Sequence, residues 1–234
     1  EGVTLMAKER SVTLDYSGRE LRDPPHQSYS ILRAKFDRWL AEQVEARGAM
    51  LLTKVRVDDV IRKDGGVTGV LAGGDELRAD VVIACDGALS LIAEKAGLRS
   101  PGLPRDYALG VKEVIALDAG IINDRFHLQG SEGAAHLFVG EVTQGRFGGG
   151  FLYTNRESIS LGIVIGIGDL IGEKPALDVP ALLDAFKQYA EIAPLIRGGD
   201  TLEYAAHVIP EGGFRGLCPL YGNGLLVAGD AAGL

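Results

Sequence analysis

VVIACDGALS at residues 81–90 and LLVAGDAAG at residues 225–233 decide the fold of this chain. Each stretch begins with an uninterrupted apolar run, which is typical of a strand buried on both faces of a parallel sheet. Each run then ends in an aspartate, Asp86 or Asp230, with a glycine beside it. Because ligands of open α/β sheets bind outside the carboxyl ends of the strands, these two ends form the candidate ligand site.

The residues that precede and follow the first strand predict the remainder of a nucleotide-binding domain. A helix is predicted from Ser30, its N-cap, to Gly48, its stop. An antiparallel ribbon over residues 51–77 and a second helix over Ala88–Ala96 are also predicted. This order resembles the later part of a doubly wound domain whose opening strand and glycine turn are missing.

After Pro104 the pattern becomes rich in short strands. They are predicted over residues 109–117, 135–141, 147–154, 158–167 and 202–209, with a helix over 179–192. The predicted fold class is α/β with α+β character: a partial Rossmann-like domain with an inserted antiparallel β-rich substrate domain. The boundaries expected are residues 1–104 and 211–234 for the first domain and 105–210 for the insert.

Composition excludes several classes of function. The formal charge is -8 at pH 7 and the sequence has no basic stripe, so no nucleic-acid partner is expected. Cys85 and Cys218 are too few for a disulfide framework or an iron–sulfur cluster, and both are expected to be buried apolar residues. No apolar run approaches the roughly 20 residues that cross a bilayer.

The residues at the two strand ends suit a ligand that carries sugar and phosphate. Gly229 lets the backbone approach a ligand closely, and Asp230 can accept a hydrogen bond from a sugar hydroxyl. A helix that begins at Ala231–Gly233 would favour negative charge at its N-terminus. The alternative is that Asp230 is only a helix N-cap and Asp86 only a turn residue. The same arrangement at both strand ends favours ligand binding.

These motifs resemble a known family. CDGALS (85–90) paired with GLLVAGDAAGL (224–234) is similar to the DG and GD motifs of the glutathione-reductase-related flavoproteins, which include aromatic hydroxylases and geranylgeranyl reductases. Within that group YSILRAKFDRWLAEQ (29–43), GVKEVI (110–115) and AAHVIPEGGF (205–214) resemble the electron transfer flavoprotein-quinone oxidoreductases, in particular the FixC branch.

The resemblance implies FAD as the cofactor. Arg33 would approach the FAD pyrophosphate, although a surface arginine is the alternative, and Val57 would lie by the adenine through its backbone. Asp86 would help to hold the pyrophosphate and ribityl region, and Asp230 would bind the ribityl chain. The residues expected to contact FAD are Arg33, Val57, Asp86, Gly87, Ser90, Gly229, Asp230, Ala231, Ala232 and Gly233.

A second set of residues is expected to lie near the substrate. It consists of Lys112, Glu113, His207, Glu211, Gly212 and Gly213. Lys112 and Glu113 should face opposite sides of a strand, and a surface salt-bridge strand is the alternative for them. His207 is a candidate proton donor because histidine ordinarily titrates near neutral pH, with a packed histidine as the alternative.

The activity implied is an FAD-dependent oxidoreductase that passes electrons from an electron transfer flavoprotein to a quinone or a ferredoxin-like acceptor. A geranylgeranyl reductase-type flavoenzyme, which saturates a prenyl double bond, is the alternative enzyme. The chain begins at Glu1 without a methionine and stops four residues past Asp230, so both ends are expected to be cut. A fragment without independent activity is therefore a third alternative.

The location expected is the cytoplasm, with contact at the inner membrane surface. GDLIGEKPALDVPALL, residues 168–183, is the segment that would supply a peripheral apolar patch. Ordinary core packing of Leu182, Leu183 and Phe186 is the alternative.

Overall fold

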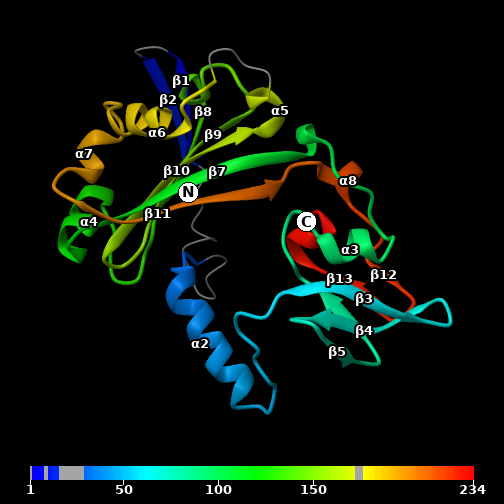
Figure 1. Cartoon of the computed structure of the whole chain (residues 1–234). Helices are drawn as coiled ribbons and strands as arrows, with labels where there is room; N and C mark the ends of the chain where they lie inside the picture. Colours follow the sequence, from blue (N-terminus) through cyan, green and yellow to red (C-terminus); the bar gives the residue numbers. More distant parts are fainter. Residues whose placement is uncertain (1, 8–9, 16–28, 172–175) are drawn as a thin grey trace. The chain divides into compact units, whose positions relative to one another are not determined.

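The computed structural model describes residues 2–7, 10–15, 29–171 and 176–234, and the chain divides into two compact units (Figure 1). The large-sheet unit comprises Glu1–Leu40, Leu109–Ile165 and Gly172–His207. The small-sheet unit comprises Ala41–Ala108, Gly166–Ile171 and Val208–Leu234.

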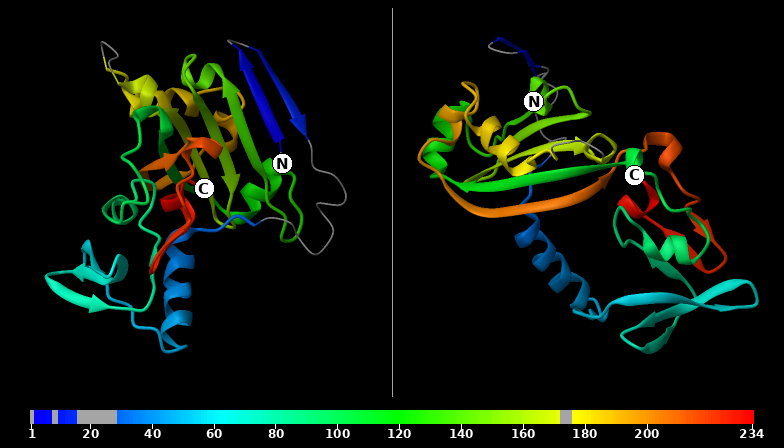
Figure 2. Two further views of the ribbon diagram at one scale, coloured as in Figure 1. Left: turned by 90° about the vertical axis from the view of Figure 1, so that its right-hand side faces the viewer. Right: turned by 45° about the horizontal axis from the view of Figure 1, so that its top comes forward.

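The large-sheet unit is built on one seven-stranded sheet in the order β11-β7-β10-β9-β8-β1-β2 (Figure 2). Its strands are β1 (Gly2–Ala7), β2 (Arg10–Asp15), β7 (Tyr107–Ala116), β8 (Ala135–Gly140), β9 (Gly148–Thr154), β10 (Ser158–Gly166) and β11 (Asp200–Pro210). Within the predicted insert the pairs β8–β9 and β9–β10 are antiparallel, as expected, and β1 joins the sheet by pairing with β8 in parallel. Residues 2–7 and 10–15, expected in the nucleotide-binding domain, instead contribute β1 and β2 to this sheet.

The centre of this sheet forms the core of the unit. β10 is buried along most of its length, and Phe186 of the helix α6 (Val179–Lys187) packs over Gly150 of β9. A Cβ at Gly150 would lie 2.6 Å from the Phe186 ring, so only glycine leaves room for it. Asp178 is the N-cap of α6, and its carboxylate accepts the Ala181 N–H at 3.0 Å. The helix predicted over residues 179–192 ends at Lys187, earlier than expected.

The remaining helices of the large-sheet unit are short, except for α2. They are α2 (Arg33–Glu45), α4 (Ala119–Phe126), the turn η2 (Glu141–Thr143) and α7 (Ala193–Ile196). The division between the units falls within α2, after Leu40. Ser30 is not the N-cap that was expected, because α2 begins at Arg33 and the Ser30 hydroxyl donates to the Thr154 carbonyl at 2.7 Å.

The small-sheet unit contains two three-stranded sheets. β3 (Val57–Lys63), β4 (Gly66–Ala72) and β5 (Asp75–Arg78) form the antiparallel ribbon, whose first strand begins at Val57 rather than at residue 51. The second sheet has the order β12-β13-β6, with β12 (Tyr221–Gly222), β13 (Leu225–Val227) and β6 (Val82–Ala84). Short helical segments connect these strands: α3 (Leu91–Lys95), η1 (Pro104–Asp106), α5 (Ile167–Leu170), α8 (Gly213–Gly216) and η3 (Gly229–Ala232).

One hydrophobic cluster joins these strands to α3. It contains Val67, Ala84, Ile92, Ala93, Leu225, Val227, Ala231 and Ala232. Ala84 of β6 and Leu225 and Val227 of β13 are buried, whereas Ile83 is 59% exposed and Leu226 is 43% exposed. The expectation of burial on both faces is therefore wrong here. A short apolar run has the same composition whether one face or both are covered, so the sequence could not distinguish the two cases.

Candidate functional site

The two strand ends singled out in the sequence meet at one edge of a sheet. β6 and β13 are parallel neighbours, with Ala84 opposite Val227, and the N–H of Ala228 donates to the Ala84 carbonyl at 3.0 Å. The loops that follow these strands, residues 85–90 and 229–233, therefore leave the sheet side by side. They are called the DG loop and the GD loop below.

The DG loop is held by its own aspartate. Asp86 Oδ2 accepts the N–H of Ile92 in the first turn of α3 at 2.9 Å, and Oδ1 lies 3.4 Å from the Ser90 hydroxyl. Ser90 is completely buried and has φ 44°, a left-handed conformation that is uncommon outside glycine. Its N–H donates to the Gly87 carbonyl at 2.9 Å. The Asp86 carboxylate thus fixes the loop to the helix.

The GD loop leaves its aspartate free. Gly229 has φ 64° and a Cβ there would meet open space, while a Cβ at Gly233 would lie 2.6 Å from the Gly216 carbonyl oxygen. The exposed Asp230 carboxylate makes no hydrogen bond or ion pair within residues 2–7, 10–15, 29–171 and 176–234. The alternative that Asp230 is an N-cap is wrong, because Ala228 holds the N-cap position of η3 and no side chain caps it.

The expected helix after Asp230 is a single 3-10 turn. η3 runs from Gly229 to Ala232, and Gly233 with φ 86° ends it. One turn has little of the summed dipole of an α-helix, so the N–H groups of the loops themselves are the donors available at this edge. Those of Gly87, Leu89 and Asp230 donate no hydrogen bond to any residue that the structure describes.

Arg99 connects the DG loop to the GD loop, and the sequence had not pointed to it. Its Nη1 donates to the Ala88 carbonyl at 2.9 Å and to the Ala231 carbonyl at 3.2 Å. Its Nη2 donates to the hydroxyl of the buried Tyr107 at 2.8 Å. A lone arginine after a glycine-ended helix has no distinctive pattern, so no sequence signal could have identified this contact.

The predicted substrate residues Glu211, Gly212 and Gly213 lie in the small-sheet unit. The N–H of Glu211 donates to the Asp106 carbonyl at 2.8 Å, and α8 follows directly. Gly216, at the end of α8, lies against Gly233 of the GD loop. The structure thus brings residues 211–216 to the GD loop of the candidate site. The Cys218 N–H adds a further contact by donating to the Ala232 carbonyl at 3.2 Å.

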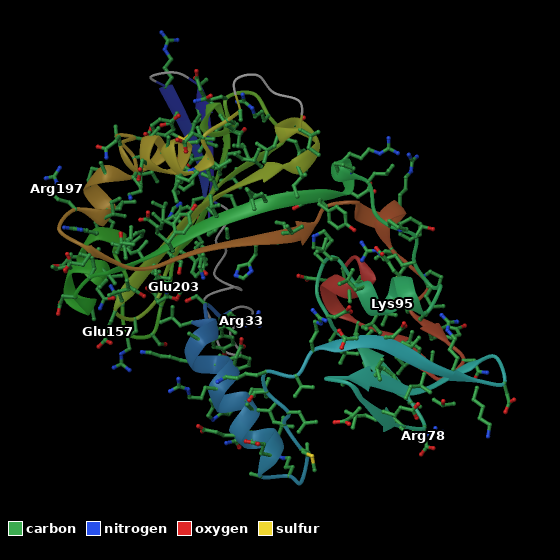
Figure 3. The ribbon with its side chains drawn as sticks, in the orientation of Figure 1. Arg33, Arg78, Lys95, Glu157, Arg197 and Glu203 are labelled. Atoms are coloured by element: carbon green, nitrogen blue, oxygen red, sulfur yellow. The ribbon has the colours of Figure 1, made fainter. Side chains whose placement is uncertain are left out.

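Arg33 and Val57 lie on elements other than the two loops. Arg33 lies at the start of α2 in the large-sheet unit (Figure 3), where its Nε donates to Asp37 Oδ1 at 2.8 Å and its Nη2 to Oδ2 at 3.1 Å. This hydrogen bond lowers the pKa of the Asp37 carboxyl. Val57 opens β3, in the sheet that does not contain β6 or β13.

Lys112, Glu113 and His207 belong to the large-sheet unit. Glu113 is buried on β7, and its carboxylate accepts Lys187 Nζ at 3.0 Å and the Thr201 hydroxyl at 3.1 Å. The adjacent Lys112 is half-buried, and His207 on β11 is exposed. The alternative of a surface salt bridge is therefore wrong for Glu113, whose ion pair is buried.

Burial of Lys187 alone would lower the pKa of its ammonium group, but the hydrogen bonds to Glu113 and Asp184 outweigh this effect and raise it. The Lys187 ammonium group is therefore held charged inside the unit. The contacts of Glu113 with Lys187 and Thr201 join α6 to β7 and β11. They therefore stabilise the fold of the unit.

Burial bears on two other expectations. Cys85 is exposed at the start of the DG loop, whereas Cys218 is half-buried against the hydrophobic cluster. The segment considered for membrane contact includes Leu182 and Leu183, and Phe186 follows it. All three residues are at most 4% exposed and belong to the core. Residues 172–175 of that segment lie outside the described residues. Among the residues described, no helix is long and apolar enough to span a bilayer.

The geometry of the two loops fits a nucleotide cofactor. Free N–H groups can donate to phosphate oxygens, and the free Asp230 carboxylate can accept from sugar hydroxyls. The positive φ of Gly87 and Gly229, with no side chain in the way, lets the backbone approach the ligand. No group of three or more His, Cys, Asp or Glu residues that could hold a metal occurs in the described part of the chain.

Comparison with known proteins agrees with this geometry. Protein FixC of Escherichia coli K12 is 49% identical over 234 residues, and the match covers all of this chain and 54% of the relative. The probable electron transfer flavoprotein-quinone oxidoreductase YdiS of the same strain is 47% identical over 233 residues. The chain therefore spans about 54% of the length of the curated relatives it matches.

Solved structures share the fold. A geranylgeranyl bacteriochlorophyll reductase-like protein from Thermoplasma acidophilum has a TM-score of 0.69 at 20% identity, covering 100% of this chain and 55% of its own. The flavin-dependent brominase Bmp2 has a TM-score of 0.66 at 14% identity, covering 99% of this chain and 55% of its own. At these identities the likeness concerns the fold alone.

The family described as FAD binding domain matches residues 1–128, more than half of the sequence. That stretch includes β6, the whole DG loop and Arg99. With the two loops side by side at the edge of a parallel strand pair, the chain belongs to the FAD-binding domain family.

Proposed function

We propose that the DG loop and the GD loop hold FAD, and that the whole protein is an FAD-dependent oxidoreductase. It would accept electrons from an electron transfer flavoprotein and pass them to a quinone or a ferredoxin-like acceptor. The name of the relative YdiS, a probable electron transfer flavoprotein-quinone oxidoreductase, supports the reaction class. The observation that carries the proposal is the parallel register of β6 and β13, which places Asp86 and Asp230 on neighbouring loops.

Within this proposal each loop has a separate task. The free N–H groups of Gly87 and Leu89 would donate to the pyrophosphate, while Asp230 would accept from the ribityl hydroxyls. Asp86 would act by holding the DG loop on α3, because its oxygens already accept from Ile92 and Ser90. When bound, FAD supplies the electron-transfer chemistry, and the protein positions it and adjusts its potential.

The roles given to residues outside these loops are further parts of the proposal. Arg33 would exchange its contact with Asp37 for the pyrophosphate, and Val57 would lie by the adenine. Glu211, Gly212 and Gly213 would face the acceptor, since α8 lies against Gly233. His207, which is exposed, would deliver a proton to the acceptor.

The experiment is reoxidation of reduced electron transfer flavoprotein by the full-length protein with a soluble quinone present. The proposal predicts that the FAD-loaded protein accelerates reoxidation and that the FAD-free protein does not. Asp80→Ala, which changes an exposed aspartate outside both loops, should behave as wild type. Turnover of a prenyl diphosphate without quinone turnover would contradict the proposed reaction.

We also propose a cytoplasmic location with peripheral contact at the inner membrane, because a quinone acceptor resides in the bilayer. Cell fractionation tests this: the protein should sediment with membranes and be released by high salt or carbonate. Recovery of all the protein in the cytosolic fraction at low salt would contradict the membrane contact.

A further inference from the structure

Arg99 is placed to set the orientation of peptide groups in both loops. A trans peptide points its C=O and its N–H in opposite directions. Because Arg99 takes up the carbonyls of Ala88 and Ala231, the N–H groups of Leu89 and Ala232 point away from the guanidinium. The Leu89 N–H is one of the free donors at the site. Arg99 thus binds the side of each loop that faces the protein.

The arginine is itself held in place by Tyr107. Tyr107 is 7% exposed, its ring centroid lies 5.7 Å from the guanidinium carbon, and its hydroxyl accepts from Nη2. A Cβ at Gly102 would overlap that hydroxyl, so glycine at this position leaves space for the ring. The planar guanidinium can reach three oxygens at once, which a lysine ammonium on a flexible stem cannot do as well.

The charge of Arg99 is not neutralised locally. Its hydrogen-bond acceptors are two main-chain carbonyls and a phenol, and it forms no ion pair with any residue in the described part of the chain. A half-buried positive charge beside both loops stabilises negative charge on a ligand that they bind. This applies to a pyrophosphate and to a flavin that gains electrons.

We infer that Arg99 is a positioning residue for FAD: it fixes the DG loop relative to the GD loop and supplies positive charge behind them. The inference rests on the proposed function. It goes further by naming the group that joins two loops from separate parts of the sequence, with Tyr107 as its support.

The test uses the full-length protein with three variants of this contact. Arg99→Met removes the charge and every hydrogen bond, Arg99→Lys keeps the charge without the planar fork, and Tyr107→Phe removes one acceptor. Arg62→Met is the matched control, because Arg62 donates to the Lys95 carbonyl at the end of α3 and has no hydrogen bond to either loop. FAD dissociation constants and the midpoint potential of bound FAD are measured for each.

Arg99→Met should weaken FAD binding by on the order of tenfold or more, as expected when hydrogen bonds to a charged group are lost, and should make the potential more negative. Arg99→Lys should weaken binding but leave the potential near wild type, because the charge remains. Tyr107→Phe should weaken binding a few-fold, and Arg62→Met should change neither quantity. The potential is the readout that a purely structural role would not move.

If the wild-type protein binds FAD and Arg99→Met binds it as tightly as Arg62→Met does, this inference alone is overturned. Wild-type protein that binds no FAD would overturn the proposed function as well. If Arg99→Met does not fold, the test rests on Arg99→Lys and Tyr107→Phe. Wild-type affinity for FAD in both of these variants would overturn the inference.

Discussion

The carboxylate of Asp86 accepts the backbone N–H of Ile92 at 2.9 Å, so that an aspartate of the candidate cofactor loop also fixes the first turn of α3. Asp230, on the neighbouring loop, has no such contact within the described residues. Two aspartates that look alike in the sequence therefore differ in what they do for the fold, and the predictions for them differ accordingly.

Replacement of Asp86 by alanine should destabilise the protein. Loss of a carboxylate that accepts a helix N-terminal N–H costs about 1 kcal/mol. Asp86→Asn keeps an acceptor oxygen and should retain most of this stability. Urea unfolding of the apoprotein measures the difference, and equal unfolding midpoints for Asp86→Ala and wild type would show that the contact with Ile92 contributes nothing.

Replacement of Asp230 by alanine should leave stability unchanged but weaken FAD binding. The side chain is exposed and unpaired among the described residues, so the stability change should stay within about 0.5 kcal/mol. Loss of a charged acceptor for a ligand hydroxyl should reduce affinity by roughly tenfold or more. Isothermal titration with FAD measures this, with Asp80→Ala as the control. An unchanged dissociation constant would remove Asp230 from the site.

The two glycines of the GD loop should respond differently to alanine. Gly229→Ala places its methyl group in open space and should cost only the left-handed backbone strain, about 1–2 kcal/mol. Gly233→Ala adds a clash with the Gly216 carbonyl oxygen and should cost more. Thermal unfolding of both apoproteins gives the order. Gly229→Ala should nevertheless weaken FAD binding, because its methyl group projects where the ligand approaches; normal affinity would contradict that placement.

Replacement of Lys187 by methionine should destabilise the large-sheet unit. The buried Glu113 would lose its counter-charge, which costs about 3 kcal/mol or more for a well-buried pair. The double variant with Glu113→Gln should recover part of the loss. Chemical denaturation of both variants tests this, and a double variant no more stable than Lys187→Met would count against the buried pair.

The same pair predicts a dependence on pH. The pKa of Lys187 is raised in the folded protein above its ordinary value of 10.5. Its contribution to the free energy of unfolding is therefore complete below pH 10.5 and is lost as the pH rises through the folded-state pKa. The wild-type free energy of unfolding should therefore fall at higher pH more steeply than that of Lys187→Met. Parallel curves for the two proteins would show that Lys187 does not titrate in this way.

The strand pair and its two loops could be predicted from sequence because they depend on local patterns. An apolar run followed by aspartate and glycine at residues 81–87 and 225–230 predicts a strand end and a turn, and β6 and β13 confirm the strands. The motifs also identified the family, because short combinations such as CDGALS with GLLVAGDAAGL are specific together.

Other features could not be predicted because they depend on contacts between distant residues. The parallel pairing of β1 with β8 places residues 2–7 in the large sheet, and nothing in their composition indicates which sheet they join. Arg99 acts through three acceptors on separate segments. The exposure of Cys85 follows from its position at a loop rather than from its chemistry.

The proposed function requires that residues 85–90 and 229–233 together bind FAD. Hydrogen–deuterium exchange of the full-length protein, with and without FAD, tests it directly. FAD should slow amide exchange in both loops at once, because their free N–H groups become donors, while the tip of the β4–β5 turn at residues 73–74 should be unchanged. Protection elsewhere with no change in either loop would contradict it.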